Sequence, residues 1–190
     1  MPTGKTPIYC WDSCVFISLL TKTDRTEEEL EKLCAVERLS DNGGCIIFTA
    51  AITLVEVLAC MLTPEQENMF QDLLQRSNVT AVSITPRIAT KAREIRDYYQ
   101  TRGIKLAVPD SIHLATAIQF NATALHTYDG AGKRRRRSDL LQLATPLIEK
   151  YPLTVMKPEP PPAEVPEAPE EGHIAGLFDE PPVEPEPQGA

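Results

Sequence analysis

Four acidic side chains stand beside apolar stretches of the chain, where a charged group is costly unless it has a partner. They are Asp12, Glu56, Asp110 and Asp129. Asp12 directly follows one apolar stretch and precedes another, and Glu56 is enclosed by two valines. Carboxylate oxygens are the hard ligands that Mg²⁺ and Mn²⁺ require. The pattern therefore indicates a site for a divalent cation and metal-assisted chemistry.

Three of these acids also have ordinary structural explanations when each is taken alone. Asp110 could cap a helix, Asp129 could open a turn with Gly130, and Glu56 could be a solvated helix residue. Asp12 is harder to explain in this way, because apolar residues flank it on both sides. The metal site therefore depends on whether the fold gathers the four acids.

The apolar pattern divides the chain into alternating strands and helices. Short stretches rich in strand formers predict strands at residues 8–11, 46–48, 79–84, 125–128 and 153–156. Longer stretches with helical spacing predict helices at residues 15–20, 26–41, 50–61, 64–76, 86–102, 110–120 and 138–144. Thr49 is expected to cap the helix that follows the second strand. Such alternation predicts an α/β fold, a three-layer α/β/α domain with a mainly parallel sheet.

This fold would bring acids that are distant in sequence to one place. The carboxyl ends of parallel strands share one edge of a sheet, and open α/β sheets bind their ligands there. Asp12 and Asp129 follow predicted strands, and Asp110 opens a predicted helix. We therefore expect these three acids at that edge, with Glu56 carried to them by the helix after the second strand.

The acids lie in motifs that resemble those of the PIN domain family. That family has a strand ending in Asp before a hydroxyl residue, a Glu in a Val/Leu-rich helix, an Asp opening an Ala-rich helix, and a strand followed by Thr-x-Asp. The matching segments are Trp11-Asp12-Ser13, Leu54-Val55-Glu56-Val57-Leu58, Pro109-Asp110-Ser111-Ile112-His113-Leu114-Ala115-Thr116-Ala117 and Ala124-Leu125-His126-Thr127-Tyr128-Asp129. The resemblance covers roughly residues 8 to 156.

The resemblance implies a metal-dependent ribonuclease, with VapC-type toxins the closest in size. In such an enzyme the four carboxylates would hold Mg²⁺ or Mn²⁺, which activates water and orients the scissile phosphate. Ser13 and Thr127 would orient those carboxylates by hydrogen bonds. An antitoxin partner and a homodimer are implied in the same way. A non-catalytic module that binds RNA or a protein partner on the same fold stays open as the alternative.

The end of the chain has a different composition from the rest. Residues 158–190 contain ten of the seventeen prolines and nine acidic residues, with no Lys or Arg. The whole chain has 27 acids and 19 bases, so residues 1–157 have 27 − 9 = 18 acids against 19 bases. We therefore predict a nuclease domain at 1–157, followed by a disordered acidic, proline-rich tail at 158–190.

A run of five cations follows Asp129 closely in sequence. Its members are Lys133, Arg134, Arg135, Arg136 and Arg137. Because the run is tethered near the predicted metal site, it is a candidate for contacts with RNA phosphates. The plainer interpretation is a solvated charged segment without a ligand.

Other features place the chain in a reducing compartment. The five cysteines are an odd number, the amino terminus lacks a signal-peptide pattern, and no apolar run approaches the roughly 18 residues of a membrane span. We expect a cytoplasmic protein with no membrane partner, in which Cys10 and Cys14 are buried core thiols. His113 and His126 are predicted to be packed or surface residues, since neither has a nucleophile at triad spacing.

Overall fold

The structure is a computed structural model, and it describes residues 6–132, 136 and 138–161. Four members of the basic run (Lys133, Arg134, Arg135 and Arg137) and the predicted tail from residue 162 onward lie outside the described residues. Within the described part of the chain, no helix is long and apolar enough to cross a bilayer.

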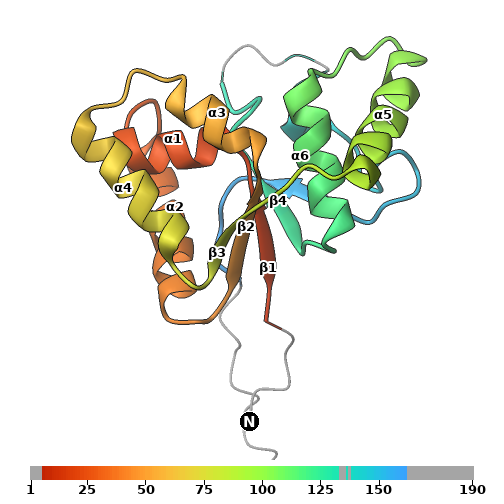
Figure 1. Cartoon of the computed structure of the whole chain (residues 1–190). Helices are drawn as coiled ribbons and strands as arrows, with labels where there is room; N and C mark the ends of the chain where they lie inside the picture. Colours follow the sequence, from red (N-terminus) through yellow and green to blue (C-terminus); the bar gives the residue numbers. More distant parts are fainter. Residues whose placement is uncertain (1–5, 133–135, 137, 162–190) are drawn as a thin grey trace, which may run out of the picture.

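A five-stranded parallel sheet forms the centre of the molecule (Figure 1). Its strands are β1 (Ile8–Trp11), β2 (Ile46–Ala50), β3 (Val79–Val82), β4 (Ala124–His126) and β5 (Thr154–Met156). They lie in the order β3-β2-β1-β4-β5, and each neighbouring pair runs parallel. The central strand β1 pairs Cys10 with Phe48 on one side and with Leu125 on the other. The predicted parallel sheet is therefore confirmed.

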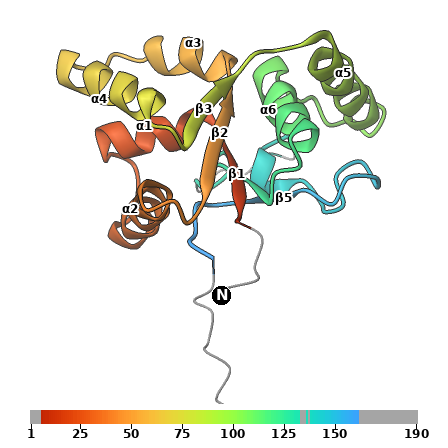
Figure 2. The same ribbon diagram turned by 60° about the horizontal axis from the view of Figure 1, so that its bottom comes forward.

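Helices cover both faces of this sheet (Figures 1 and 2). They are α1 (Ser13–Thr21), α2 (Glu27–Asp41), α3 (Ile52–Leu58), α4 (Pro64–Gln75), α5 (Pro86–Gln100), α6 (Val108–Gln119) and the 3₁₀ turn η1 (Leu140–Gln142). The first four helices lie on one side, and α5 and α6 lie on the other. The three-layer α/β/α fold is confirmed.

Two apolar cores fill the spaces between the layers. Along β1, Tyr9 and Trp11 point into the core shared with α1, α2 and α4, whereas Cys10 points into the core shared with α5 and α6. Successive side chains of a strand face opposite sides of a sheet, so a strand buried on both faces must be apolar throughout. This explains why the predicted strands are short continuous apolar runs.

Threonine caps fix the starts of three helices. Thr26 and Glu29 form a capping box on α2, Thr63 and Gln66 form another on α4, and Thr85 caps α5. These side-chain hydrogen bonds satisfy backbone N–H groups of the first turn and fix where each helix begins.

The predicted cap at Thr49 is wrong. Thr49 belongs to β2, where it pairs with Ala81, and α3 begins three residues later with no side-chain cap. Its hydroxyl donates to the carbonyl of Trp11 at 2.7 Å and lies 2.5 Å from the hydroxyl of Thr53. The β-branched Thr49 continues the ladder with β3, so the strand extends past the predicted end.

Candidate metal centre

Asp12 lies at the carboxyl end of β1, where it is 5% exposed and also begins α1. Its carboxylate accepts hydrogen bonds from the backbone N of Ser13 (2.6 Å) and the hydroxyl of Ser13 (3.1 Å). The hydroxyl of Thr127 donates to it at 2.7 Å, from the end of β4. These donors offset the cost of burying the charge and fix the direction of the carboxylate. Ser13 and Thr127 both contact Asp12 directly.

Cys14 completes the surroundings of Asp12. Its Sγ lies 3.2 Å from Oδ2 of Asp12 and 3.3 Å from Oγ1 of Thr127, and it accepts the backbone N–H of Tyr128 at 3.1 Å. Burial and the charge of Asp12 hold the pKa of Cys14 well above its usual range, so the group is a thiol that donates to the carboxylate. Cys10 is a buried core thiol as predicted, but Cys14 belongs to the site.

Glu56 reaches the same place from α3. Its Oε2 lies 2.9 Å from Nε2 of His113, and that nitrogen is 3.3 Å from Oδ1 of Asp12. His113 is 1% exposed. One ligand atom from each of these three residues lies within 4.8 Å of the others, the spacing of a metal-binding group. Glu56 is therefore not a solvated helix residue.

His113 is the residue that the sequence analysis set aside. Burial by itself lowers the pKa of His113, but the hydrogen bond to Glu56 and the charges of Asp12 and Asp110 outweigh it and raise the pKa. Whether the imidazole is charged or is neutral with its proton on Nε2, the Nε2–H group can donate to Glu56 and Asp12 together. The spacing Asp110-x-x-His113 puts both side chains on one face of α6, and this is the signal that could have identified it.

Asp110 stands in the first turn of α6, two residues after its first residue. The cap of α6 is Ala107, so Asp110 is not the N-cap. Burial, followed by the charges of Asp12 and Asp129, raises the pKa of Asp110 to about 6. The carboxylates of Asp12, Asp110 and Asp129 therefore repel one another, and a divalent cation would relieve that repulsion.

Asp129 follows β4 and is held by the chain on both sides. Its backbone N donates to Oγ1 of Thr127 at 3.0 Å, and its Oδ2 accepts the backbone N of Leu140 at 2.7 Å. Gly130 has φ of 87°, and a Cβ there would meet Asp139 at 2.8 Å. The predicted Asp-Gly turn exists, and it places Asp129 close enough to raise the pKa of Asp110.

Arg136 is the one member of the basic run inside the described ranges. It is exposed, its backbone N donates to Oδ2 of Asp139, and its charge lowers the pKa of Asp129. Burial is the larger influence on Asp129 and raises that pKa overall. Arg136 thus lies within electrostatic reach of the carboxylates.

The donor set fits a hard divalent cation. Its carboxylate oxygens suit Mg²⁺ or Mn²⁺, whereas the imidazole of His113 is a kind of ligand more typical of Zn²⁺ or Cu²⁺. Burial, followed by the charges of neighbouring carboxylates, raises the pKa values of Asp110 and Asp129, as expected where a positive charge belongs. Asp110 and Asp129 lie outside the 4.8 Å group, so the compact part of the centre is Asp12, Glu56 and His113.

The fold and the acidic edge define the class, a parallel α/β domain with an acidic centre where its strands end. The sequence model of the PIN domain matches residues 9–137, more than half of the 190 residues. The chain therefore belongs to the PIN domain family, and the resemblance found from the motifs is confirmed. No curated protein sequence matches the chain.

Solved structures with the same fold include several toxin–antitoxin proteins. VapBC2 from Rickettsia felis, bound to a promoter DNA fragment, has 16% identity over 79% of this chain and 97% of its own, with a TM-score of 0.53. VapC20 from Mycobacterium tuberculosis, a toxin that cleaves the sarcin-ricin loop, has 14% identity over 67% of this chain and 99% of its own, with a TM-score of 0.50. DNA-bound VapBC from Salmonella typhimurium has 13% identity over 80% of this chain and 97% of its own, also with a TM-score of 0.50. At such identities the likeness shows a shared fold.

Proposed function

We propose that this chain is a metal-dependent endoribonuclease of the VapC type, the toxin of a toxin–antitoxin pair. The observation that carries the proposal is the convergence of Asp12, Glu56 and His113 within 4.8 Å at the carboxyl edge of the sheet. The PIN family membership and the toxin structures that share the fold support the same class. Its substrate is RNA.

In this proposal Asp12, Glu56, Asp110 and Asp129 hold Mg²⁺ or Mn²⁺. The bound cation supplies a water of lowered pKa and stabilises the charge of the phosphate oxygens as the bond breaks. Ser13 and Thr127 keep the Asp12 carboxylate in one orientation through the hydrogen bonds described above. Cleavage leaves a 5′ phosphate and a 3′ hydroxyl.

His113 acts on the centre through Glu56. Because its Nε2 lies between Glu56 and Asp12, a donated hydrogen bond holds the two carboxylates close together. Its other ring nitrogen, Nδ1, is buried with no partner among the described residues. A metal-bound histidine usually donates its second N–H to an acceptor, so the contacts favour a positioning role over a ligand role.

The basic run supplies phosphate contacts beside this centre. The charge of Arg136 lowers the pKa of Asp129, which supports a role for Arg136 in attracting a phosphate held near the carboxylates. Each phosphate contact on a single strand contributes about −0.7 to the slope of log affinity against log salt. Lys133, Arg134, Arg135 and Arg137 would add further contacts of this kind.

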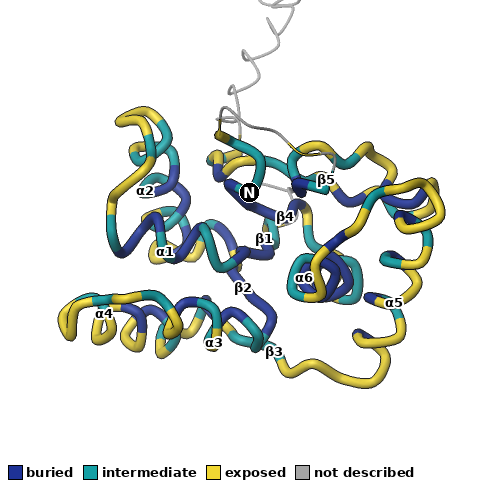
Figure 3. Tube along the Cα trace, turned by 90° about the horizontal axis from the view of Figure 1, so that it is seen from above, coloured by how far each residue is buried: buried dark blue, intermediate teal, exposed yellow. Residues whose placement is uncertain are grey.

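Exposed apolar side chains on α3 and α4 support an antitoxin or a second copy of the chain as partner. Val55 (69% exposed) and Leu58 lie on α3, the fully exposed Met61 lies between the two helices, and the exposed Met69 lies on α4. Apolar groups gathered on one part of a surface are typical of protein interfaces. Figure 3 shows that α4 presents exposed segments along its outer side.

Cleavage of RNA by the purified full-length chain tests this proposal. We expect cleavage with Mg²⁺ or Mn²⁺ and none with a chelator. Asp12→Asn should lose most of the activity while keeping its fold, whereas the matched surface variant Asp72→Asn should keep the rate of the parent, since Asp72 is exposed on α4. A folded parent that binds RNA but never cuts it, with any divalent cation, would favour the non-catalytic binding module.

A further inference from the structure

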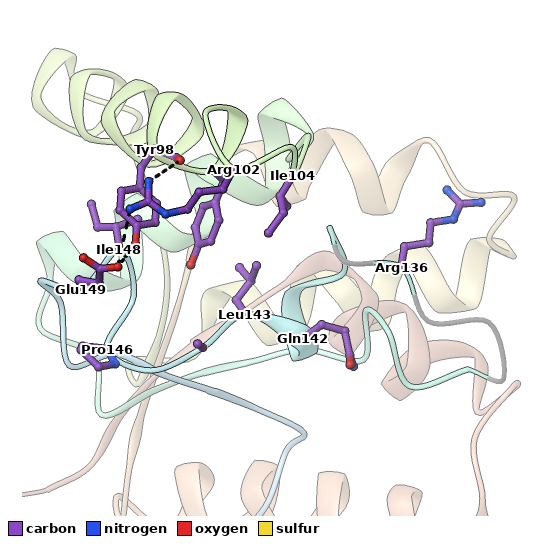
Figure 4. Close-up of a pocket in the computed structure, with 11 residues that line it drawn as sticks. Tyr98, Arg102, Ile104, Arg136, Gln142, Leu143, Pro146, Ile148 and Glu149 are labelled. Carbon is purple, nitrogen blue, oxygen red and sulfur yellow. Dashed lines mark hydrogen bonds and ion pairs between the residues drawn. The ribbon is translucent and has the colours of Figure 1, made fainter.

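A hollow of about 480 Å³ opens between the end of α5 and residues 142–149 (Figure 4). Tyr98 and Arg102 stand on one side and Arg136 on the other. None of the carboxylates of the metal centre lines it. The hollow is therefore separate from the metal centre, and Arg136 links the two because it lines the hollow while its charge lowers the pKa of Asp129.

The walls combine flat and apolar surfaces. The guanidinium of Arg102 lies 3.6 Å from the ring centroid of Tyr98, so the two planes form one stacked platform. Ile104, Leu143 and Ile148 supply apolar surface in the lining. Such a combination suits a flat aromatic ligand, because every nucleobase has a face that stacks on aromatic rings or guanidinium groups.

Polar groups stand at the rim. Glu149 accepts a hydrogen bond from the hydroxyl of Tyr98 at 2.8 Å and lies 3.7 Å from Arg102. The side-chain amide of Gln142 is exposed, and it makes no hydrogen bond to any of the described residues. Carboxylate and amide groups pair with the edges of bases, so the rim can satisfy the polar atoms of a base held by the platform.

The segment between Asp129 and Gln142 joins this hollow to the metal centre. Leu140 donates its backbone N to Oδ2 of Asp129, and Leu141 donates to the carbonyl of Asp129 at 3.2 Å. Gln142 ends the same 3₁₀ turn, which rises about 2.0 Å per residue, so it lies on the order of 4 Å further along the axis than Leu140. Gln142, which lines the hollow, is therefore within one short turn of the backbone contact to Asp129.

The charge around the hollow suits a polyanion. Arg102 and Arg136 line it, and Arg96 and Lys105 line a neighbouring hollow that shares Ile104 with it. The buried Nε of Arg96 has no hydrogen-bond partner among the described residues. Against these four cations stands one acid in the lining, Glu149.

We propose that this hollow is a subsite for one nucleotide of the RNA substrate that lies outside the cleaved linkage. The base stacks on the platform of Tyr98 and Arg102, and Arg136 contacts the phosphate between this nucleotide and the metal centre. The subsite rests on the proposed ribonuclease function, and it adds a place where bases outside the cleaved linkage are held.

Filling the hollow tests the subsite. Ala144 lines it and is exposed, so Ala144→Trp places a large ring in the hollow, and Ala89→Trp, at an exposed position on α5 outside it, is the matched control. Affinity for a fluorescent single-stranded RNA is measured by anisotropy on the full chain with a chelator present. Stacking of one base is worth about fivefold to a hundredfold in affinity, so we expect Ala144→Trp to lose that much and Ala89→Trp to lose none.

A charge variant keeps the test independent of the new tryptophan. Arg102→Gln removes the platform cation, and its control is Arg93→Gln, whose arginine pairs with Asp97 on the exposed side of α5. We expect Arg102→Gln to weaken RNA binding severalfold, and Arg93→Gln to match the parent. Both arginine variants should bind Mn²⁺ like the parent in calorimetry, and both should cleave a dinucleotide too short to reach the hollow at the rate of the parent.

Two results overturn the proposal, and they differ from failure of the ribonuclease function. If the parent binds and cuts RNA while Ala144→Trp and Arg102→Gln do so equally well, the hollow holds no nucleotide, and the function stands. If the parent neither binds nor cuts RNA, the function and the subsite both fall.

Discussion

Nε2 of His113 lies 2.9 Å from Oε2 of Glu56, although 57 residues separate the two in sequence. The contact joins α6 to α3 across the end of the sheet. It holds the Glu56 carboxylate, whose side chain is 28% exposed, close to the Asp12 carboxylate, whose side chain is 8% exposed. The carboxylates of Glu56 and Asp12 repel each other, and the hydrogen bond from His113 holds them together against this repulsion.

Removing this hydrogen bond should weaken metal binding without removing a carboxylate. We expect His113→Leu to lower Mn²⁺ affinity about tenfold to a hundredfold, as is typical when a group that orients a metal ligand is lost. His113→Gln can place an amide N–H near Glu56 and should recover part of that loss. Calorimetry measures both, and equal affinities of His113→Leu and the parent would remove His113 from the account.

His126 should make the fold sensitive to acid. It is fully buried, stacks on Tyr9 at 4.3 Å between ring centroids, and has no hydrogen-bond partner for either nitrogen among the described residues. Burial lowers the pKa of His126 to about 3. The unfolded chain binds a proton near pH 6.5 and the folded chain does not, so the free energy of unfolding falls as the pH drops below about 6.5.

Replacing His126 by Phe keeps the stacking and removes the titration. At about pH 5 the imidazole costs roughly 2 kcal/mol, since one pKa unit corresponds to about 1.4 kcal/mol. Thermal melts of His126→Phe should therefore lose less stability between about pH 7 and pH 5 than those of the parent. Parallel losses in the two proteins would mean that His126 does not govern the acid response.

Asp110 should destabilise the metal-free fold at neutral pH. Its pKa of about 6 lies above the ordinary value, so the folded chain holds its proton longer than the unfolded chain, and stability falls as the pH rises through the interval from about 4 to 6. A shift of this size corresponds to roughly 3 kcal/mol, which solvent screening of a half-buried group reduces to about 1 to 2 kcal/mol.

The variant Asp110→Asn tests this conflict between stability and metal binding. Without metal at neutral pH it should melt a few degrees above the parent, because about 1 kcal/mol shifts the Tm of a domain of this size by roughly 2 to 4 °C. With Mn²⁺ the parent should gain stability and Asp110→Asn should gain much less. If the metal-free variant melts below the parent, the charge of Asp110 does not destabilise the metal-free fold.

The predicted boundary before Pro158 can be tested with two truncations. Glu159 pairs with Lys32 at 3.1 Å, and Lys157 pairs with Glu29 at 2.7 Å, so the ordered contacts continue past the predicted end of the domain. Deletion of residues 162–190 should leave the Tm and the RNA cleavage rate unchanged. Deletion from Pro158 should lower the Tm only slightly, because exposed ion pairs contribute little. A large loss in either truncation would mean that the end of the chain packs on the domain.

The sequence pattern predicts the layers well because the strands are buried on both faces. Continuous apolar runs such as residues 8–11 and threonine caps such as Thr26 are local signals, and both correspond to observed elements. Thr49 misleads because its local pattern is that of a cap, while pairing with Ala81 across the sheet keeps it in the strand. Local propensity gives way to tertiary pairing there.

The four acids could be chosen as candidates from the sequence because each stands beside an apolar stretch, and the structure brings Asp12 and Glu56 into one compact group. Cys14 and His113 could not be found so easily, since a thiol or an imidazole is ordinary in an apolar segment. Their partners come from elsewhere in the chain: Thr127 for Cys14 and Glu56 for His113. Such contacts exist only after β1, β4, α3 and α6 have met at one edge.

Binding of Mn²⁺ and cleavage of RNA, measured on the same preparation, test the central claim most directly. Calorimetry gives the Kd for Mn²⁺, and the cleavage rate is followed as Mn²⁺ is titrated. If the acidic centre holds the catalytic metal, the two curves should reach half-maximum at the same Mn²⁺ concentration, Asp12→Asn should abolish or strongly weaken both, and Asp72→Asn should change neither. Cleavage that saturates without measurable binding, or an Asp12→Asn variant that binds and cuts like the parent, would contradict the account.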